Sequence, residues 1–188
     1  MKQTSGLTSY PVFPDWVFAG TLQISNEIVE KLLTENHDLE HGDFGAVTKV
    51  GKFTQNTLNL TRLIGTVFFD TMASHYRLTG SQRNIESVDA QLYHVSPGKC
   101  VPHSISRHRW YKSVLYLDCD SRSSKIHLPM MDNKAYATPP GVQDYEHLIE
   151  PEKFKIVFWP AHLPWGLSYN HSRKDTVIFT NSFIIKAK

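Results

Sequence analysis

The chain has 188 residues, of which 40% are hydrophobic and 20% are charged, and its formal net charge is +2. This composition excludes a disordered chain, and the length is sufficient for one domain with a buried core. Because there is no long basic stripe and no apolar run long enough to cross a bilayer, we expect neither a nucleic-acid partner nor a membrane span.

Two helices are predicted in the first part of the chain. Ser25 or Asn26 can cap a first helix that ends near Asn36, with a core-facing side formed by Ile28, Val29, Leu32 and Leu33. A second helix is predicted from Thr57 to Leu78. Its apolar residues recur at helical spacing: Leu60, Ile64, Val67, Phe68, Met72 and Tyr76.

From Ile85 onward the pattern changes to short runs typical of strands, separated by turn residues. These runs are SVDAQLYHV, SVLYLD, KIHLPMM, FKIVFWP and DTVIFTNSFII. Many short strands with Gly/Pro turns favour a sandwich, jelly roll or small barrel. We therefore predict a single domain over 1–188 of the α+β class, mainly β. Its N-terminal segment, about 1–84, holds two helices that pack outside a β core over about 85–188.

The β half resembles a known fold family. The runs LYHVSPGKCVPHS, SVLYLDCDSRSSKIHL, FKIVFWPAHLPWGLSYNHS and TVIFTNSF occur in the order seen in the double-stranded β-helix of the Fe(II)/2-oxoglutarate oxygenases. The likeness is strongest to the prolyl-hydroxylase-like proteins of phages and bacteria. The resemblance implies a jelly-roll core and, in active members, two histidines and a carboxylate that hold iron. It also implies an arginine that binds the far carboxylate of 2-oxoglutarate.

Only one of these four groups is present at its expected position. His103 falls where the first iron ligand belongs, but Ile105 replaces the carboxylate. Trp165 occupies the place of the second histidine, and Thr176 the place of the arginine. Isoleucine has no donor atom and an indole has only an N–H. The resemblance thus implies a degenerate active site, and we expect no catalytic residues and no cofactor.

These replacements favour a non-catalytic structural or binding subunit that associates with other protein subunits, for example in a phage particle. The first residues include no apolar signal segment, so we expect the protein in the cytoplasm or assembled into a virion. Trp165 is expected to lie buried in the mouth of the barrel, near His103 and Ile105, with a partner for its N–H.

An active Fe(II)/2-oxoglutarate dioxygenase, a hydroxylase with an atypical ligand set, is the alternative. In that case His103 and His162 would hold the metal, and Arg173 and Lys174 would bind 2-oxoglutarate. His127 is a further candidate ligand, although a histidine in a core or at its rim is the more ordinary interpretation.

Overall fold

Two helices form where the sequence predicts them. A computed structural model describes residues 8–12, 15–35, 37–48, 54–76, 85–106, 108–129 and 146–185. Helix α1 spans Asn26–Thr34, and the Ser25 side chain caps it by accepting a hydrogen bond from the backbone N–H of Ile28 at 3.4 Å. Helix α2 spans Gln55–Tyr76, and its predicted apolar stripe is buried except for the last residue. The last two residues predicted for this helix, 77–78, lie outside the described residues.

Neither of these two described helices combines the length and the apolar character that a membrane span requires.

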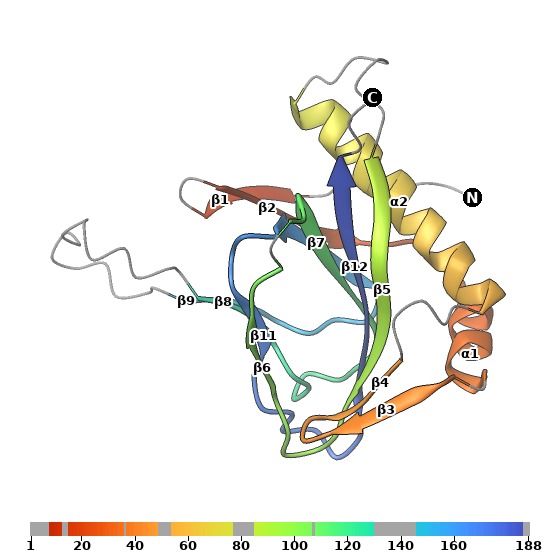
Figure 1. Cartoon of the computed structure of the whole chain (residues 1–188). Helices are drawn as coiled ribbons and strands as arrows, with labels where there is room; N and C mark the ends of the chain where they lie inside the picture. The colour runs from red at the N-terminus through yellow and green to blue at the C-terminus, as the bar shows by residue number, and fades with distance from the viewer. Residues whose placement is uncertain are drawn as a thin grey trace, which may run out of the picture.

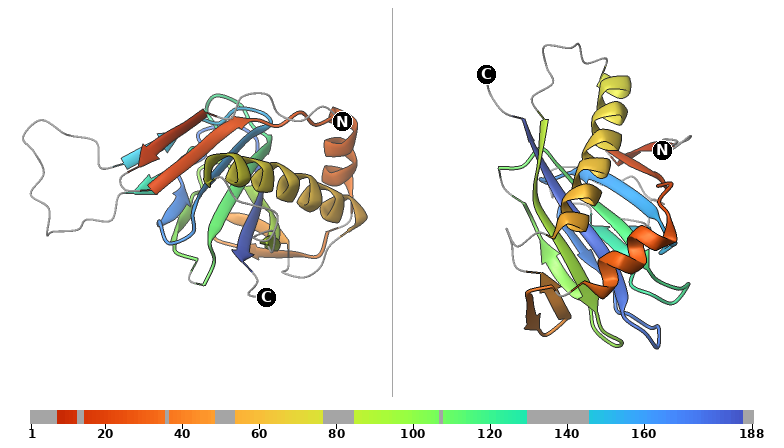
Figure 2. Two further views of the ribbon diagram at one scale, coloured as in Figure 1. Left: turned by 90° about the horizontal axis from the view of Figure 1, so that it is seen from above. Right: turned by 90° about the vertical axis from the view of Figure 1, so that its right-hand side faces the viewer.

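Eight strands form one large antiparallel sheet in the order β1-β2-β10-β7-β12-β5-β4-β3. Their bounds are Thr8–Val12 (β1), Asp15–Thr21 (β2), Leu39–Gly42 (β3), Gly45–Thr48 (β4), Ile85–Val95 (β5), Tyr111–Asp118 (β7), Lys155–Pro160 (β10) and Thr176–Ile185 (β12). Helix α2 runs along one face of this sheet, and α1 lies at the start of α2 (Figures 1 and 2).

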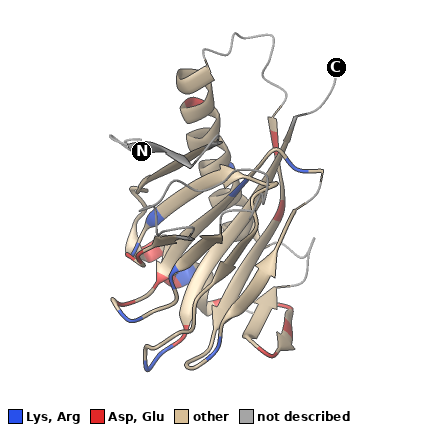
Figure 3. Cartoon of the chain, turned by 90° about the vertical axis from the view of Figure 1, so that its left-hand side faces the viewer, with Lys and Arg blue, Asp and Glu red and all other residues tan. Residues whose placement is uncertain are grey.

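Four shorter strands form a second antiparallel sheet on the opposite face, in the order β6-β11-β8-β9. Their bounds are Val101–Ser104 (β6), Ile126–Pro129 (β8), Glu146–Ile149 (β9) and Trp165–Leu167 (β11). The two sheets face each other, as Figure 1 shows, and the space between them is filled by side chains. In Figure 3 the charged segments lie mostly in loops and at strand ends, with both signs interspersed.

Alternation along the strands divides the interior into two cores. On β7, Leu115 and Leu117 point toward the helices, where they join a cluster that includes Phe68 of α2. Val114 and Tyr116 point the other way, into a cluster between the two sheets. A central strand buried on both faces accounts for the nearly continuous apolar run in this part of the sequence.

The structure confirms a mainly β fold of the α+β class with two helices packed outside a jelly-roll core. The expected order of helices first and strands afterwards is wrong, because the N-terminal segment also contributes strands β1 to β4 to the large sheet. These strands extend both edges of the sheet beyond the predicted β core, with β2 pairing with β10 and β4 pairing with β5.

Candidate functional site

Trp165 lies inside the cluster between the two sheets. It is the first residue of β11, and its side chain is only 1% exposed. Its ring centroid lies 5.7 Å from that of Trp159 on β10 and 6.3 Å from that of Tyr93 on β5. The expected burial is confirmed. The expected partner for the indole is not found, since the Trp165 Nε1 atom has no hydrogen bond among the described residues.

A lysine covers the Trp165 ring. The Nζ atom of Lys112, on β7, lies 4.4 Å from the ring centroid, a cation–π distance, and donates a hydrogen bond to the Ser106 Oγ atom at 3.2 Å. Burial lowers the pKa of Lys112 to about 8, which the charge of Asp89 partly opposes and that of Arg109 reinforces. The amine is therefore mostly charged at pH 7 and about half neutral near pH 8.

The two charged neighbours of Lys112 are paired with each other. The Arg109 Nε atom lies 2.6 Å from the Asp89 Oδ2 atom, and both side chains are partly exposed. Asp89 has a positive φ of 52° where the pairing of β12 with β5 shifts register. Since Arg109 binds Asp89, the contacts of the partly buried Lys112 ammonium among the described residues are a hydroxyl and an aromatic face.

His103 lies on the outer face of the small sheet and contacts His127. Trp165 and Leu167 belong to the inner cluster, so Gly166 between them faces outward. A Cβ atom on Gly166 would lie 2.7 Å from the Cδ2 atom of His103, which places that ring on the outer face. The His103 Nε2 and His127 Nδ1 atoms are 2.7 Å apart. The expectation that His103 packs beside the Trp165 ring is therefore wrong.

A change of register explains why His103 faces outward. Trp165 of β11 pairs with Ser104 of β6, but Leu167 pairs with Val101, so β6 carries one more residue than β11 over this stretch. A bulge of this kind re-aims the side chain beside it. The structure thus brings His103 to His127, a pair that the sequence analysis does not predict.

Ile105 and His162 are both exposed. Ile105 follows β6 directly and is 45% exposed, so the expectation that it lies with the buried Trp165 ring in the mouth of the barrel is wrong. His162 lies in the tight turn between β10 and β11, closed by a hydrogen bond from the Leu163 N–H to the Pro160 carbonyl oxygen at 3.0 Å.

Arg173 and Lys174 lie in the loop before β12, and both are exposed. The Lys174 Nζ atom binds the Asp118 Oδ1 atom at 2.6 Å, and this bond raises the pKa of Lys174. Asp118 is the last residue of β7 and Lys112 is the second, so the Asp118 carboxylate that binds Lys174 lies about 20 Å along the strand from Lys112.

Thr176, at the position expected for the arginine, is fully buried. Its Oγ1 atom accepts a hydrogen bond from the backbone N–H of residue 124 at 3.1 Å.

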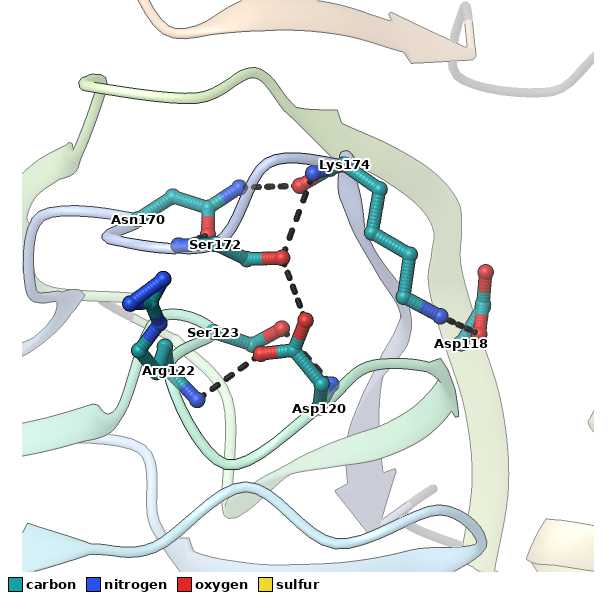
Figure 4. Close-up of polar contacts among 7 residues, drawn as sticks. All are labelled: Asp118, Asp120, Arg122, Ser123, Asn170, Ser172 and Lys174. Atoms are coloured by element: carbon teal, nitrogen blue, oxygen red, sulfur yellow. Dashed lines mark hydrogen bonds and ion pairs between the residues drawn. The ribbon is translucent and has the colours of Figure 1, made fainter.

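The loop that carries Lys174 is held to the hairpin loop after β7 by a polar network (Figure 4). The Ser172 hydroxyl donates to the Asp120 Oδ2 atom at 2.5 Å, and the Arg122 backbone N–H donates to the Oδ1 atom at 2.8 Å. The buried Asn170 amide donates to the Lys174 carbonyl oxygen at 2.9 Å. Because the side chains of Asn170, Ser172 and Asp120 are engaged in these bonds, we interpret their role as structural.

Replacing Ser172 with alanine is expected to lower the free energy of unfolding near neutral pH, because it removes a hydrogen bond to the Asp120 carboxylate. Urea denaturation measures this change, with alanine at the exposed Ser104 as the matched control. The Ser172 hydroxyl and the Arg122 N–H hold the pKa of Asp120 below its usual value. The contribution of this bond is therefore present above the unfolded-state pKa of Asp120 and is lost in acid. The stability difference should become smaller there, leaving the part due to the hydrogen bond that the Ser172 Oγ atom accepts from the Lys174 N–H.

No family model and no curated protein sequence matches the chain. Solved structures match it over nearly its full length. A prolyl-4-hydroxylase from Pseudomonas putida has 13% sequence identity and a TM-score of 0.59, with 94% of this chain and 92% of that chain covered. A prolyl hydroxylase from Trichoplax adhaerens, solved with a peptide of hypoxia inducible factor, has 10% identity and a TM-score of 0.60, with coverages of 93% and 86%.

A viral collagen prolyl hydroxylase from Paramecium bursaria Chlorella virus-1, solved as a 2OG complex, has 11% identity and a TM-score of 0.54, with coverages of 88% and 94%. The chain has the fold of the 2-oxoglutarate/Fe(II) oxygenases. At these identities the likeness defines the oxygenase fold and leaves the chemistry to the residues of this chain.

The residues at the expected positions do not fit iron and 2-oxoglutarate. Ile105 has no donor atom, and Trp165 offers only an N–H inside an apolar cluster. Thr176 carries no charge to pair with a carboxylate, and its hydroxyl oxygen is already engaged. Across the described ranges, no group of three or more His, Cys, Asp or Glu side chains is arranged to hold a metal ion.

Lys112 is not among the predicted site residues, although the sequence contains a signal for it. In the run YKSVLYLD it stands two residues before Val114 and four before Tyr116, so the period of a strand places all three on one face. A lysine in phase with buried apolar residues indicates a largely buried amine.

Proposed function

We propose that this chain is a non-catalytic protein of the oxygenase fold that works as a structural or binding subunit of a larger assembly, such as a phage particle. The observation that carries the proposal is the buried Trp165, with Lys112 above its ring, at the position where the resemblance expects the second histidine ligand. An indole in this place fills the interior with packing atoms and supplies no lone pair for a metal.

The electrostatics of the interior support the same proposal. The oxygenase chemistry implied by the resemblance needs a carboxylate ligand for iron and a cation for 2-oxoglutarate. In this chain Lys174 instead binds Asp118 at the far end of β7, and the ring of Trp165 is covered by Lys112, whose positive charge repels a metal cation. The chain thus keeps the two hydrophobic cores of the fold without the groups that bind iron and 2-oxoglutarate, which is consistent with a role in binding other proteins.

A second candidate function is an Fe(II)/2-oxoglutarate dioxygenase with an atypical ligand set. The full-length likeness to prolyl hydroxylases favours it. On this alternative His103 and His162 would hold iron, so the exposed His103 would have to turn from His127 toward the barrel mouth. The first proposal requires no such rearrangement.

Succinate formation from 2-oxoglutarate in the presence of Fe(II), ascorbate and oxygen tests the proposal. We expect no succinate above the rate without protein, since the residues that would bind both groups are replaced. The P. putida prolyl-4-hydroxylase serves as the positive control. Turnover that disappears in a His103→Ala variant would establish the dioxygenase instead.

The assembly role has its own test. In an extract of the source cells, gel filtration with antibody detection is expected to find the protein at a larger size than the purified chain. Elution at the same position as the purified chain would contradict the subunit role and would leave the result of the succinate assay unaffected.

A further inference from the structure

Two histidines contact each other over strand β11, on the outer face of the small sheet. His103 comes from β6 and His127 from β8, and β11 lies between these strands. Their Nε2 and Nδ1 atoms are 2.7 Å apart, and the ring centroids are 4.5 Å apart with an angle of 62° between the planes. The two nitrogens therefore face each other across the width of one strand.

Gly166 makes this meeting possible. It pairs with His127 across β11 and β8, and any Cβ atom at this position would lie 2.7 Å from the Cδ2 atom of His103 and 2.8 Å from the Val101 carbonyl oxygen. A larger residue would force the His103 ring away. The bulge in β6 and the glycine in β11 together bring both imidazoles to the same spot.

We propose that His103 and His127 bind one divalent transition-metal ion, of the class of Zn²⁺, Cu²⁺ or Ni²⁺, on the outer face of the small sheet. Two imidazole nitrogens without a carboxylate select these borderline ions over Mg²⁺, Ca²⁺ or Mn²⁺. The metal takes the place of the hydrogen between the rings: the donor ring carries its proton on its other nitrogen, and both facing lone pairs bind the ion. Water completes the coordination.

The geometry needs only a small adjustment. Two nitrogens bound to one tetrahedral Zn²⁺ at the usual bond length lie about 3.3 Å apart, so the rings must separate by about 0.6 Å. His103 is exposed and stands on β6, an edge strand of the small sheet, so its ring can move outward. This site uses neither the barrel interior nor His162, and it is independent of the proposed function.

Isothermal titration of the untagged full chain with ZnCl₂ or NiCl₂ tests the site. The matched variants are His103→Gln and His127→Gln, and His171→Gln, at an exposed histidine in the loop before β12, is the control. Partners that merely orient a ligand change metal affinity by about 10- to 100-fold. Loss of a ligand is therefore expected to weaken binding by at least about tenfold in each pair variant, with the control unchanged.

Two results would overturn the proposal. One is an isotherm of the parent chain that equals that of the double variant His103→Gln/His127→Gln, which would mean that the rings form a hydrogen bond only. The other is binding that persists in both single variants but is lost in His171→Gln. Melting curves by circular dichroism identify any variant that has lost its fold, and either result leaves the succinate assay to decide the proposed function by itself.

Discussion

Replacing Trp165 with alanine lowers the free energy of unfolding by about 3–5 kcal/mol, the usual effect of deleting a large core aromatic side chain. The reason is its position: the ring is 1% exposed and packs between Trp159, Tyr93 and the ammonium of Lys112. Removing it leaves a cavity between two sheets whose backbones are fixed by hydrogen bonds, so the cavity can collapse only in part.

Urea denaturation of the Trp165→Ala variant measures this effect. The matched control is Tyr169→Ala, which removes an aromatic side chain that is 59% exposed and is expected to change stability by no more than about 0.5 kcal/mol. Equal stability of the Trp165→Ala variant and the parent would show that the ring does not fill the interior. His162 would then have to be reconsidered as a metal ligand.

Replacing Lys112 with methionine raises the free energy of unfolding at pH 7 by about 2 kcal/mol. The pKa of Lys112 in the folded state is about 8, against an ordinary lysine value of 10.5, so holding the charged amine in this site costs about 3 kcal/mol below pH 8. Methionine has a similar volume and removes this cost, while the lost contacts to Ser106 and the Trp165 ring offset about 1 kcal/mol.

The pH dependence identifies Lys112 as the cause. Between pH 8 and 10.5 the unfolded lysine binds more protons than the folded one, so the parent gains stability relative to the methionine variant as the pH rises. The stability difference between the two proteins should therefore shrink across this range, and contributions from other groups cancel. The control is Lys99→Met at an exposed lysine. A gap that stays constant with pH would rule out a depressed pKa for Lys112.

The helices and central strands could be predicted because their signals are local. The buried stripe on α2 repeats at helical spacing from Leu60 to Met72. The predicted strands β5, β7, β8, β10 and β12 are separated by clear turn residues, whereas the short strands β6, β9 and β11 were missed. The strands β1 to β4 were missed for the opposite reason. β3 and β4 have four residues each, including Gly42 and Gly45, and β1 contains Pro11, so their strand signals are weak. Each pair forms a local hairpin, but β2 and β4 join the sheet by pairing with β10 and β5, which for β2 is a contact distant in sequence.

The burial of Trp165 could be predicted, but the direction of His103 could not. Trp165 stands in an apolar run at a position that the resemblance places inside the barrel. His103 is turned outward by one extra residue in β6, and such a bulge has no mark in the sequence of a four-residue strand. Its contact with His127 across β11 depends on the sheet order, which only the structure provides.

The central claim is that Trp165 and Ile105 prevent this oxygenase fold from assembling an iron and 2-oxoglutarate site. Anaerobic calorimetric titration of 2-oxoglutarate into the chain with saturating Fe(II) tests it most directly. The account predicts no binding of 2-oxoglutarate to the parent, to His103→Ala or to His127→Gln. Stoichiometric binding to the parent that is lost in His103→Ala but kept in His127→Gln would contradict it, because His103 would then act as an iron ligand in the barrel and not as the partner of His127.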